Sequence, residues 1–183
     1  MSIPFNQFSF SILDSDTDLS DFECDNQDLN EFLQTDAIQY QNERLAVTRL
    51  IYFKDTPAGY FTLVSDSIEV AAIHSGDGTT EYPYRRYPAL KIARLATDRR
   101  YQKRGVGKAM LLKTMQIAIV LSRYVGVRII TVDSKPDSVK FYEKFGFRRA
   151  TRKYHDTISL YRDFHRAVCD IEDERLEGDI TEY

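Results

Sequence analysis

The amino-acid sequence predicts one α/β domain, and three observations lead to that prediction. The chain has 183 residues, enough for one well-buried α/β domain and too few for two ordinary ones. Residues 46–53 and 59–70 are rich in the β-branched and aromatic residues typical of strands. Residues 107–124 are apolar around most of a helix and follow a glycine-containing loop. We expect the domain to cover residues 1–165, followed by an acidic tail over residues 166–183.

The first part of the chain predicts a strand and then a helix. In residues 5–13, FNQFSFSIL, apolar and polar residues first alternate and then follow no regular order, which is typical of a half-buried strand. The helix after it is amphipathic, with apolar residues at helical spacing. Either Asp25 or Asn26 can cap this helix, because both side chains accept hydrogen bonds from the free N–H groups of a first turn.

The next segments predict a hairpin and a long loop. Residues 46–53 and 59–70 form the two antiparallel strands, and Pro57 and Gly59 supply the chemistry of their turn. Residues 71–87 are irregular and rich in tyrosine, which predicts a loop of the length that is often functional in compact domains.

The second half of the chain alternates strands and helices. The long apolar helix is expected to pack against a sheet, and the last helix begins near a proline and ends at a C-cap glycine. These predicted strands and helices cover residues 88–98, 107–124, 127–133, 136–146 and 157–161.

Charge is distributed unevenly along the chain. Residues 1–43 contain ten acidic residues and no Lys or Arg, whereas residues 84–128 contain twelve Lys or Arg and one acid, Asp98. Residues 170–183 are again acidic, with seven Asp or Glu and one Arg. This polarity predicts a basic face for a polyanion and acidic termini that solvate the fold or repel wrong partners.

The composition excludes several classes of protein. No apolar window is long enough for a membrane span, and the first residues lack the features of a signal peptide. Cys24 and Cys169 fit no metal spacing, so we expect two reduced thiols in a cytoplasmic protein and no metal.

The stretch Arg94–Met110, RLATDRRYQKRGVGKAM, predicts a phosphate cradle. Gly105 and Gly107 allow backbone conformations that other residues avoid and let a ligand approach the main chain. The first amides of the following helix are unpaired donors at the positive end of the helix dipole. We therefore expect an anionic cofactor here.

Two motifs and the order of the elements resemble the GNAT acetyltransferases. QKRGVG at residues 102–107 fits the family signature Q/R-x-x-G-x-G/A, and FYEKFGF at residues 141–147 fits the late motif with a tyrosine in a short helix before Gly-Phe. A narrower resemblance rests on the late motif and on two further segments, residues 21–33, DFECDNQDLNEFL, and residues 91–111. In these segments the chain is similar to the GNAT toxins of bacterial toxin-antitoxin pairs, which acetylate the amino group of aminoacyl-tRNA.

This resemblance implies a fold, a cofactor and partners. It implies a mostly antiparallel central sheet, splayed at the acetyl-CoA site, with helices on both faces. It also implies acetyl-CoA as the donor, a homodimer, a basic surface for tRNA and a ribbon-helix-helix antitoxin. Two other functions remain open, namely acetylation of a small amine, polyamine or peptide N-terminus, and a CoA-binding interaction module without catalysis.

The resemblance also implies which residues bind the cofactor. The loop amides and three cations would hold the diphosphate of CoA, and a solvated face is the alternative role for the cations. A backbone N–H near Leu95 or Ala96 would polarise the thioester carbonyl, and pantetheine would lie along that strand. The cofactor-binding residues are Leu95, Ala96, Thr97, Gln102, Lys103, Arg104, Gly105, Val106, Gly107, Lys108 and Ser134.

Tyr142 is the catalytic residue that the resemblance implies, as the general acid that reaches the CoA sulfur. The alternative is core packing, a role that Phe141 and Phe145 fit better because only Tyr142 has a dissociable proton. The general base stays open, because each candidate can equally be structural and a water relay can suffice. The candidates are Asp98, Asp133, Glu143 and His155.

Acceptor binding is assigned to a group of cations near the cofactor strand. Tyr82, Tyr84 and Tyr87 interleave with the first of them, and arginines between aromatic residues suit phosphate contact with base stacking. A solubilising face is the alternative, with Arg94 also a candidate antitoxin or dimer contact. The cations are Arg85, Arg86, Lys91, Arg94, Arg99 and Arg100.

Overall fold

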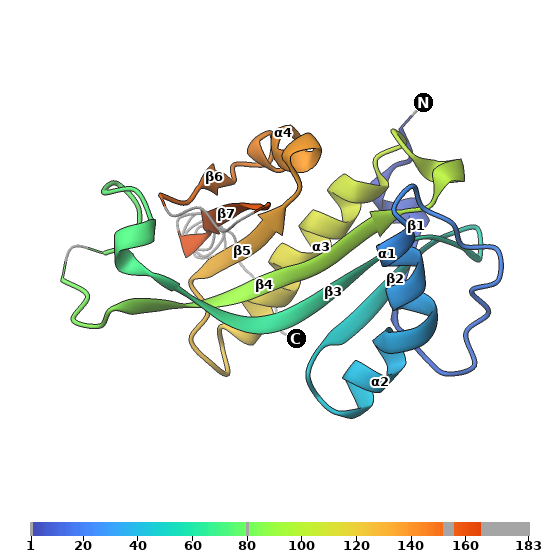
Figure 1. Cartoon of the computed structure of the whole chain (residues 1–183), viewed down its shortest axis with the longest axis horizontal. Coiled ribbons are helices and arrows are strands. Elements are labelled where there is room, and N and C mark those ends of the chain that lie inside the picture. The colour runs from blue at the N-terminus through green and yellow to red at the C-terminus, as the bar shows by residue number, and fades with distance from the viewer. Residues whose placement is uncertain (1, 80, 152–155, 166–183) are drawn as a thin grey trace, which may run out of the picture. The chain divides into compact units, whose positions relative to one another are not determined.

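The computed structural model describes residues 2–79, 81–151 and 156–165 (Figure 1). The chain divides into two compact units, and each is described by itself. The first unit contains Met1–Ser65 and Lys91–Gln116, and the second contains Asp66–Leu90 and Ile117–Tyr183. One domain over residues 1–165 stays a prediction, and the predicted tail and Cys169 lie outside the described residues.

The strands form a seven-stranded sheet in the order β1-β2-β3-β4-β5-β7-β6. Strand β1 pairs antiparallel with β2, β2 with β3, β5 with β7, and β6 with β7. The mixed α/β class is therefore as predicted. The strands are β1 Phe8–Ile12, β2 Val47–Phe53, β3 Thr56–Glu69, β4 Arg86–Thr97, β5 Ile129–Ser134, β6 Arg148–Arg149 and β7 Ile158–Asp163.

The predicted amphipathic helix is interrupted by one wider turn. It consists of α1 (Gln27–Glu31), a π-helical turn η2 (Phe32–Asp36) and α2 (Ala37–Asn42). Asn26 is the N-cap, since its side chain accepts a hydrogen bond from the amide of Asp28. Periodicity alone does not show a π turn, because the apolar residues still fall on one face. The predicted first strand is shorter than expected, because Phe5–Gln7 form a 3-10 turn, η1, before β1.

The turn of the β2–β3 hairpin differs from the prediction. Lys54 and Asp55 make the turn, with φ angles of 49° and 62°, while Pro57 and Gly59 lie inside β3. A bulge between Ile51 and Tyr52 accommodates this register. Gly59 is needed for space rather than for a turn, because a Cβ atom there would lie 2.7 Å from the carbonyl oxygen of Ala96 in β4.

The core of the first unit lies between the sheet and the α1–α2 helix. Leu33, Leu50 and Tyr60 are almost completely buried there. The Tyr60 ring packs against Phe22 and Phe32, and its hydroxyl donates to the carbonyl oxygen of Leu29 at 2.7 Å. These contacts fix α1 and the loop before it on the sheet.

Helix α3 (Val106–Leu121) contains residues of both units. It follows a short 3-10 turn, η4 (Arg99–Tyr101), and ends three residues before the predicted end at residue 124. No helix of the described residues is long and apolar enough to cross a membrane.

The second unit contains the short helix η5–α4, with η5 at Pro136–Ser138 and α4 at Val139–Glu143. Gly146, with a φ of 79°, closes it as predicted: the amides of Gly146 and Phe147 donate to the carbonyl oxygens of Glu143 and Tyr142. Strand β4 begins at Arg86, two residues earlier than predicted, after the 3-10 turn η3 (Val70–Ala72). The two-residue strand β6 is too short for a sequence pattern to predict.

Candidate active site

Residues Gln102–Lys108, the predicted cofactor-binding segment that we call the cofactor loop, lead from η4 into α3. Lys103 and Gly105 have φ angles of 58° and 93°, so two of its residues are left-handed. A Cβ atom on Gly105 would lie 2.7 Å from the hydroxyl of Ser2, which can rotate away, so the left-handed backbone is what favours glycine at this position. The first N–H groups of an α-helix have no intrahelical acceptor, so the start of α3 at Val106 is a place where an anion can find donors.

The N-terminal segment lies beside this loop, which the sequence did not predict. The amide of Ile3 donates to the carbonyl oxygen of Arg104 at 2.8 Å. A hollow of about 230 Å³ opens between the segment and the start of α3. It is lined by Ser2, Ile3, Pro4, Phe5, Phe8, Gly105, Lys108, Ala109 and Leu112.

Asp98 directly follows β4, and its side chain is 1% exposed and accepts several hydrogen bonds. It accepts from the Arg100 amide at 2.9 Å and from the Arg100 guanidinium at 2.8 and 2.9 Å. It also accepts from the amide of Glu23 at 3.2 Å. Burial by itself would raise the pKa of Asp98, but these hydrogen bonds outweigh it and lower the pKa. A saturated, weakly basic carboxylate is a poor general base.

A second set of contacts connects the loop before α1 with η4 and the cofactor loop. We call Asp21–Asp25 the acidic strap. Asp25 accepts from Arg99 Nε at 2.8 Å and from Gln102 Nε2 at 2.7 Å. Arg99 also pairs with the carboxylate of Glu23, and its amide donates to the carbonyl oxygen of Glu23 at 2.9 Å. The guanidinium of Arg100 donates to the carbonyl oxygen of Asp21.

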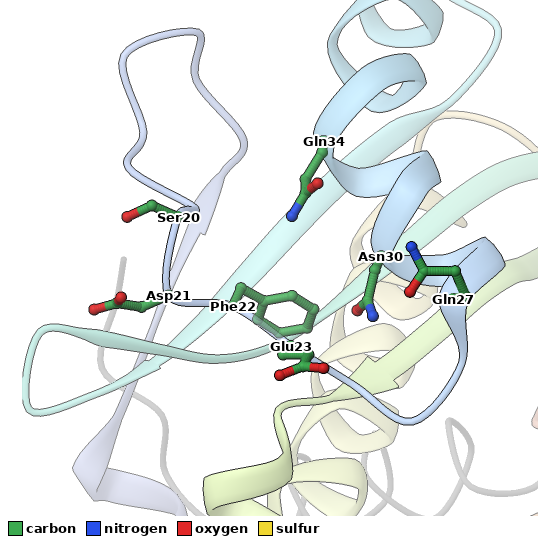
Figure 2. Close-up of a pocket in the computed structure, with 7 residues that line it drawn as sticks. All are labelled: Ser20, Asp21, Phe22, Glu23, Gln27, Asn30 and Gln34. Atoms are coloured by element: carbon green, nitrogen blue, oxygen red, sulfur yellow. The ribbon is translucent and has the colours of Figure 1, made fainter.

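The acidic strap also lines a pocket of about 430 Å³ against α1 (Figure 2). The buried side chain of Asn30 fixes the strap against α1. It accepts a hydrogen bond from the amide of Cys24 and donates one to the carbonyl oxygen of Cys24. The pocket is polar, with carboxylates from the strap and carboxamides from the helix. It is lined by Ser20, Asp21, Phe22, Glu23, Gln27, Asn30 and Gln34.

Tyr142 lies in α4 of the second unit and is 6% exposed. Its ring packs edge-on against Phe141 and Phe147, with centroids 5.0 and 5.5 Å away. Burial raises the pKa of its hydroxyl, which therefore stays protonated. Among the described residues this hydroxyl has no hydrogen-bond partner. The hydroxyls of the other buried tyrosines all have one: Tyr60 with Leu29, Tyr87 with Thr79 and Tyr161 with Asp77.

The remaining candidates for the general base have structural partners. Glu143 accepts from Arg149 at 2.9 Å, and Asp133 accepts from the hydroxyl of Ser159 at 2.6 Å. His155 lies outside the described residues. Within the described residues, no group of three or more His, Cys, Asp or Glu side chains is placed to hold a metal ion.

The residues predicted along the pantetheine lie in two strands. Leu95, Ala96 and Thr97 form the end of β4, where Ala96 is buried and the other two are half-buried. Ser134 ends β5, is 3% exposed and donates to the carbonyl oxygen of Lys135. Their binding to a cofactor stays a prediction.

Several of the cations predicted to bind the acceptor have partners inside the protein. Arg86 pairs with Glu69 and Ser67, and the Arg94 guanidinium lies 3.8 Å from the centre of the Phe32 ring. Arg99 and Arg100 belong to the contacts with the acidic strap, whereas Arg85 is exposed.

The nearby tyrosines also interact with one another. Tyr82 stacks on Tyr87 at 4.4 Å, and Tyr87 is 1% exposed, so it has no free face for a base. Tyr84 packs edge-on against Tyr82 and remains 69% exposed. The exposed aromatic surface in this loop is therefore smaller than the sequence indicates.

Residues 25–160 match the family model of the acetyltransferase (GNAT) domain. The chain belongs to the GNAT acetyltransferase family. It is therefore an acetyltransferase, with acetyl-CoA as its cosubstrate, as the motifs QKRGVG and FYEKFGF imply.

Solved structures share the fold of this GNAT acetyltransferase. AtaT complexed with acetyl-methionyl-tRNAfMet is 24% identical with a TM-score of 0.81, covering 90% of this chain and 99% of that one. A tyrosine-to-phenylalanine mutant of KacT is 20% identical with a TM-score of 0.80, covering 90% and 99%. A tyrosine-to-phenylalanine mutant of the toxin AtaT, bound to the C-terminus of the antitoxin AtaR and acetyl-CoA, is 21% identical with a TM-score of 0.71, covering 90% and 97%.

Proposed function

We propose that this GNAT acetyltransferase acetylates the α-amino group of an aminoacyl-tRNA, with Tyr142 as its general acid. Tyr142 carries the catalytic part of the proposal, because its side chain is buried and its hydroxyl is protonated and has no hydrogen-bond partner among the described residues. The likeness in fold to AtaT, solved in complex with acetyl-methionyl-tRNAfMet, supports the choice of acceptor.

The described residues of the cofactor loop fit an anionic cofactor. The left-handed Gly105 and the free amides at the start of α3 offer donors to a diphosphate, and Lys103, Arg104 and Lys108 add positive charge. Acetyl-CoA, when bound, supplies the acetyl thioester. Backbone groups of Leu95–Thr97 and Ser134 are assigned to orienting the pantetheine and the thioester carbonyl.

Tyr142 then acts as a proton donor. Because burial raises its pKa, the hydroxyl holds its proton at neutral pH and can give it to the sulfur as the amine nitrogen bonds to the acetyl carbon and the C–S bond breaks. The proton that the nitrogen loses passes to water, and the tyrosine takes a proton back from water before the next turnover. An aminoacyl ester lowers the pKa of its α-amine relative to that of a lysine side chain. A fraction of the amine is therefore neutral without a strong base, which agrees with the structural partners of Asp98, Asp133 and Glu143.

Replacing Tyr142 by Phe tests the general acid. We expect Tyr142→Phe to lower kcat by about 100-fold or more, with acetyl-CoA affinity nearly unchanged, because only the proton is lost. Tyr124→Phe, at a position that is 85% exposed and outside the proposed sites, is the matched control and should have no effect. Steady-state kinetics and calorimetry measure the two quantities, and unimpaired turnover of Tyr142→Phe would remove this residue from the mechanism.

The acceptor is tested by incubation with labelled acetyl-CoA. Total charged tRNA, the same tRNA after deacylation, small amines, polyamines and peptides are offered in parallel. The proposal expects label only in the charged tRNA, released when the aminoacyl ester is hydrolysed. Label confined to small amines or peptides would overturn the tRNA acceptor while leaving the acetyltransferase activity in place.

Two partners belong to the same proposal. A homodimer is expected, and sedimentation at several protein concentrations tests it. A ribbon-helix-helix antitoxin is also expected, supported by the likeness in fold to AtaT bound to the antitoxin AtaR. A small ribbon-helix-helix gene directly upstream, whose product binds this chain in a pull-down, would support that partner, and a monomer without such a gene would contradict both.

A further inference from the structure

The cofactor loop depends on neighbours to keep its conformation. Lys103 has a left-handed backbone, with a φ of 58°, which is unfavourable for a residue with a side chain. The residue before it, Gln102, has its carboxamide bound to Asp25 at 2.7 Å. The same carboxylate binds Arg99 Nε at 2.8 Å, on the other side of the short turn η4. The Asp25 side chain of the acidic strap thus binds the first residue of η4 and the first residue of the cofactor loop.

We propose that Asp25 is a positioning residue for acetyl-CoA binding, acting through Gln102 and Arg99. Its carboxylate uses one oxygen for each partner and so fixes the direction in which the chain enters the cofactor loop. A loop that is already ordered loses less conformational entropy when an anion binds its amides. This inference rests on the assignment of the cofactor loop to acetyl-CoA in the proposed function, but not on the identity of the acceptor.

Asp25 suits a role in positioning better than one in folding. Its side chain is 68% exposed, and that of Arg99 is 52% exposed. Exposed ion pairs contribute little to the stability of a protein. The buried anchor of the strap is Asp98, so the strap remains attached when Asp25 is replaced.

The test compares Asp25→Ala with Asp18→Ala. Asp18 is an exposed acid of the same loop that accepts from the amide of Ser20 in its own turn, and each of the two variants removes one negative charge. We expect Asp25→Ala to raise the Kd and KM for acetyl-CoA about five-fold with kcat and Tm unchanged, and Asp18→Ala to change neither constant. Calorimetry gives Kd, and kinetics with the acceptor that takes the label gives KM and kcat.

A double-mutant cycle shows whether Asp25 acts through Gln102. If it does, Asp25→Ala should add little to the loss of affinity already caused by Gln102→Ala. Additive losses, or a lowered Tm with an unchanged Kd, would overturn the positioning role and leave Asp25 as an ordinary surface residue. Asp25→Glu, which keeps the charge, should recover part of the affinity.

A charge reversal separates this inference from the proposed cofactor site. Lys103→Glu combined with Lys108→Glu should abolish acetyl-CoA binding if the loop holds the diphosphate, since both side chains are exposed and tolerate replacement. Lost binding in this variant together with unchanged binding in Asp25→Ala would overturn the inference alone. Unchanged binding in the charge-reversed loop would overturn the cofactor site and the inference with it.

Discussion

Two neighbouring groups of cations in the first unit have opposite surroundings. Arg99 and Arg100 are bound to carboxylates of Glu23, Asp25 and Asp98. In the second group, which we call the aromatic cluster, Arg104 and Lys54 lie over the rings of Phe53 and Tyr101 at 5.4 to 5.5 Å. Within the described residues, neither cation of the aromatic cluster pairs with a carboxylate.

This difference shows that the run RRYQKR, residues 99–104, is not one functional surface. Arg99 is paired with Glu23 and Asp25 of the acidic strap, and Arg100 is paired with the buried Asp98, so the positive charge of both is balanced within the chain. Among the described residues, Arg104 lies over ring faces and pairs with no carboxylate, which leaves its N–H donors for a phosphate. The acidic N-terminal part of the sequence is therefore a partner of the basic middle part, in addition to any role in solubility.

Removing Asp98 should have the largest effect, because it is the buried centre of the paired group. We expect Asp98→Ala to lower the free energy of unfolding by about 3 kcal/mol, since the amides of Glu23 and Arg100 lose their acceptor and η4 loses its N-cap. Urea unfolding measures this, with Asp18→Ala as the control at an exposed acid. Stability close to that of the native protein would mean that the strap is held by other contacts.

The aromatic cluster should instead affect ligand binding. We expect Arg104→Ala to weaken acetyl-CoA binding about ten-fold and to reduce its dependence on salt, because a phosphate contact is lost. Arg99→Ala should weaken binding only about two-fold, through the acidic strap. Calorimetry at two salt concentrations compares them. Equal losses in the two variants would erase the distinction between the groups.

The stability contributed by Asp98, which pairs with Arg100, should also depend on pH. The folded-state pKa of Asp98 lies below its ordinary value of 3.8, so the unfolded chain binds this proton more readily than the folded one. Its contribution to stability is thus complete above about pH 5 and is lost as the pH falls through the folded-state pKa. Unfolding measured between pH 6 and pH 3 should show a shallower loss of stability for Asp98→Ala, and parallel curves would contradict this linkage.

The smallest expected effect is that of Arg99→Ala on stability. The side chains of Arg99, Glu23 and Asp25 are 52%, 63% and 68% exposed, so water replaces their ion pairs at little cost. We expect a change of no more than about 0.5 kcal/mol in the free energy of unfolding. Thermal and urea unfolding check this value, and a loss similar to that of Asp98→Ala would mean that the exposed pairs stabilise the fold as well.

Local signals in the sequence predicted most of the elements. Asn26 caps its helix and Gly146 closes α4, because both roles depend on a few neighbouring residues. The glycine motif marked the loop before α3 for the same reason, while its binding to a cofactor stays a prediction. The Lys54–Asp55 turn was missed, since its left-handed backbone lacks the usual Gly or Asn and the nearby Pro57 and Gly59 looked more like a turn.

The acidic strap could not be predicted in the same way. Its contacts join residues that are 74 to 79 positions apart in the chain, so only the complementary signs of charge were visible in the sequence. Charge complementarity does not say which acid faces which base. The sequence likewise could not show that the Tyr142 hydroxyl has no partner among the described residues while other buried tyrosines do, because that depends on packing.

Gly59 has a consequence for genetics. A side chain there would press on the carbonyl oxygen of Ala96 at 2.7 Å and on Val106 at 3.0 Å, the first residue of α3. A screen for inactive but folded variants should therefore return substitutions of Gly59 together with substitutions in the cofactor loop. Gly59 lies in β3, about 40 positions away from that loop in the sequence. A map of mutational tolerance would then show few accepted substitutions at this position of the hairpin, although it lies far from the glycine motif in the sequence.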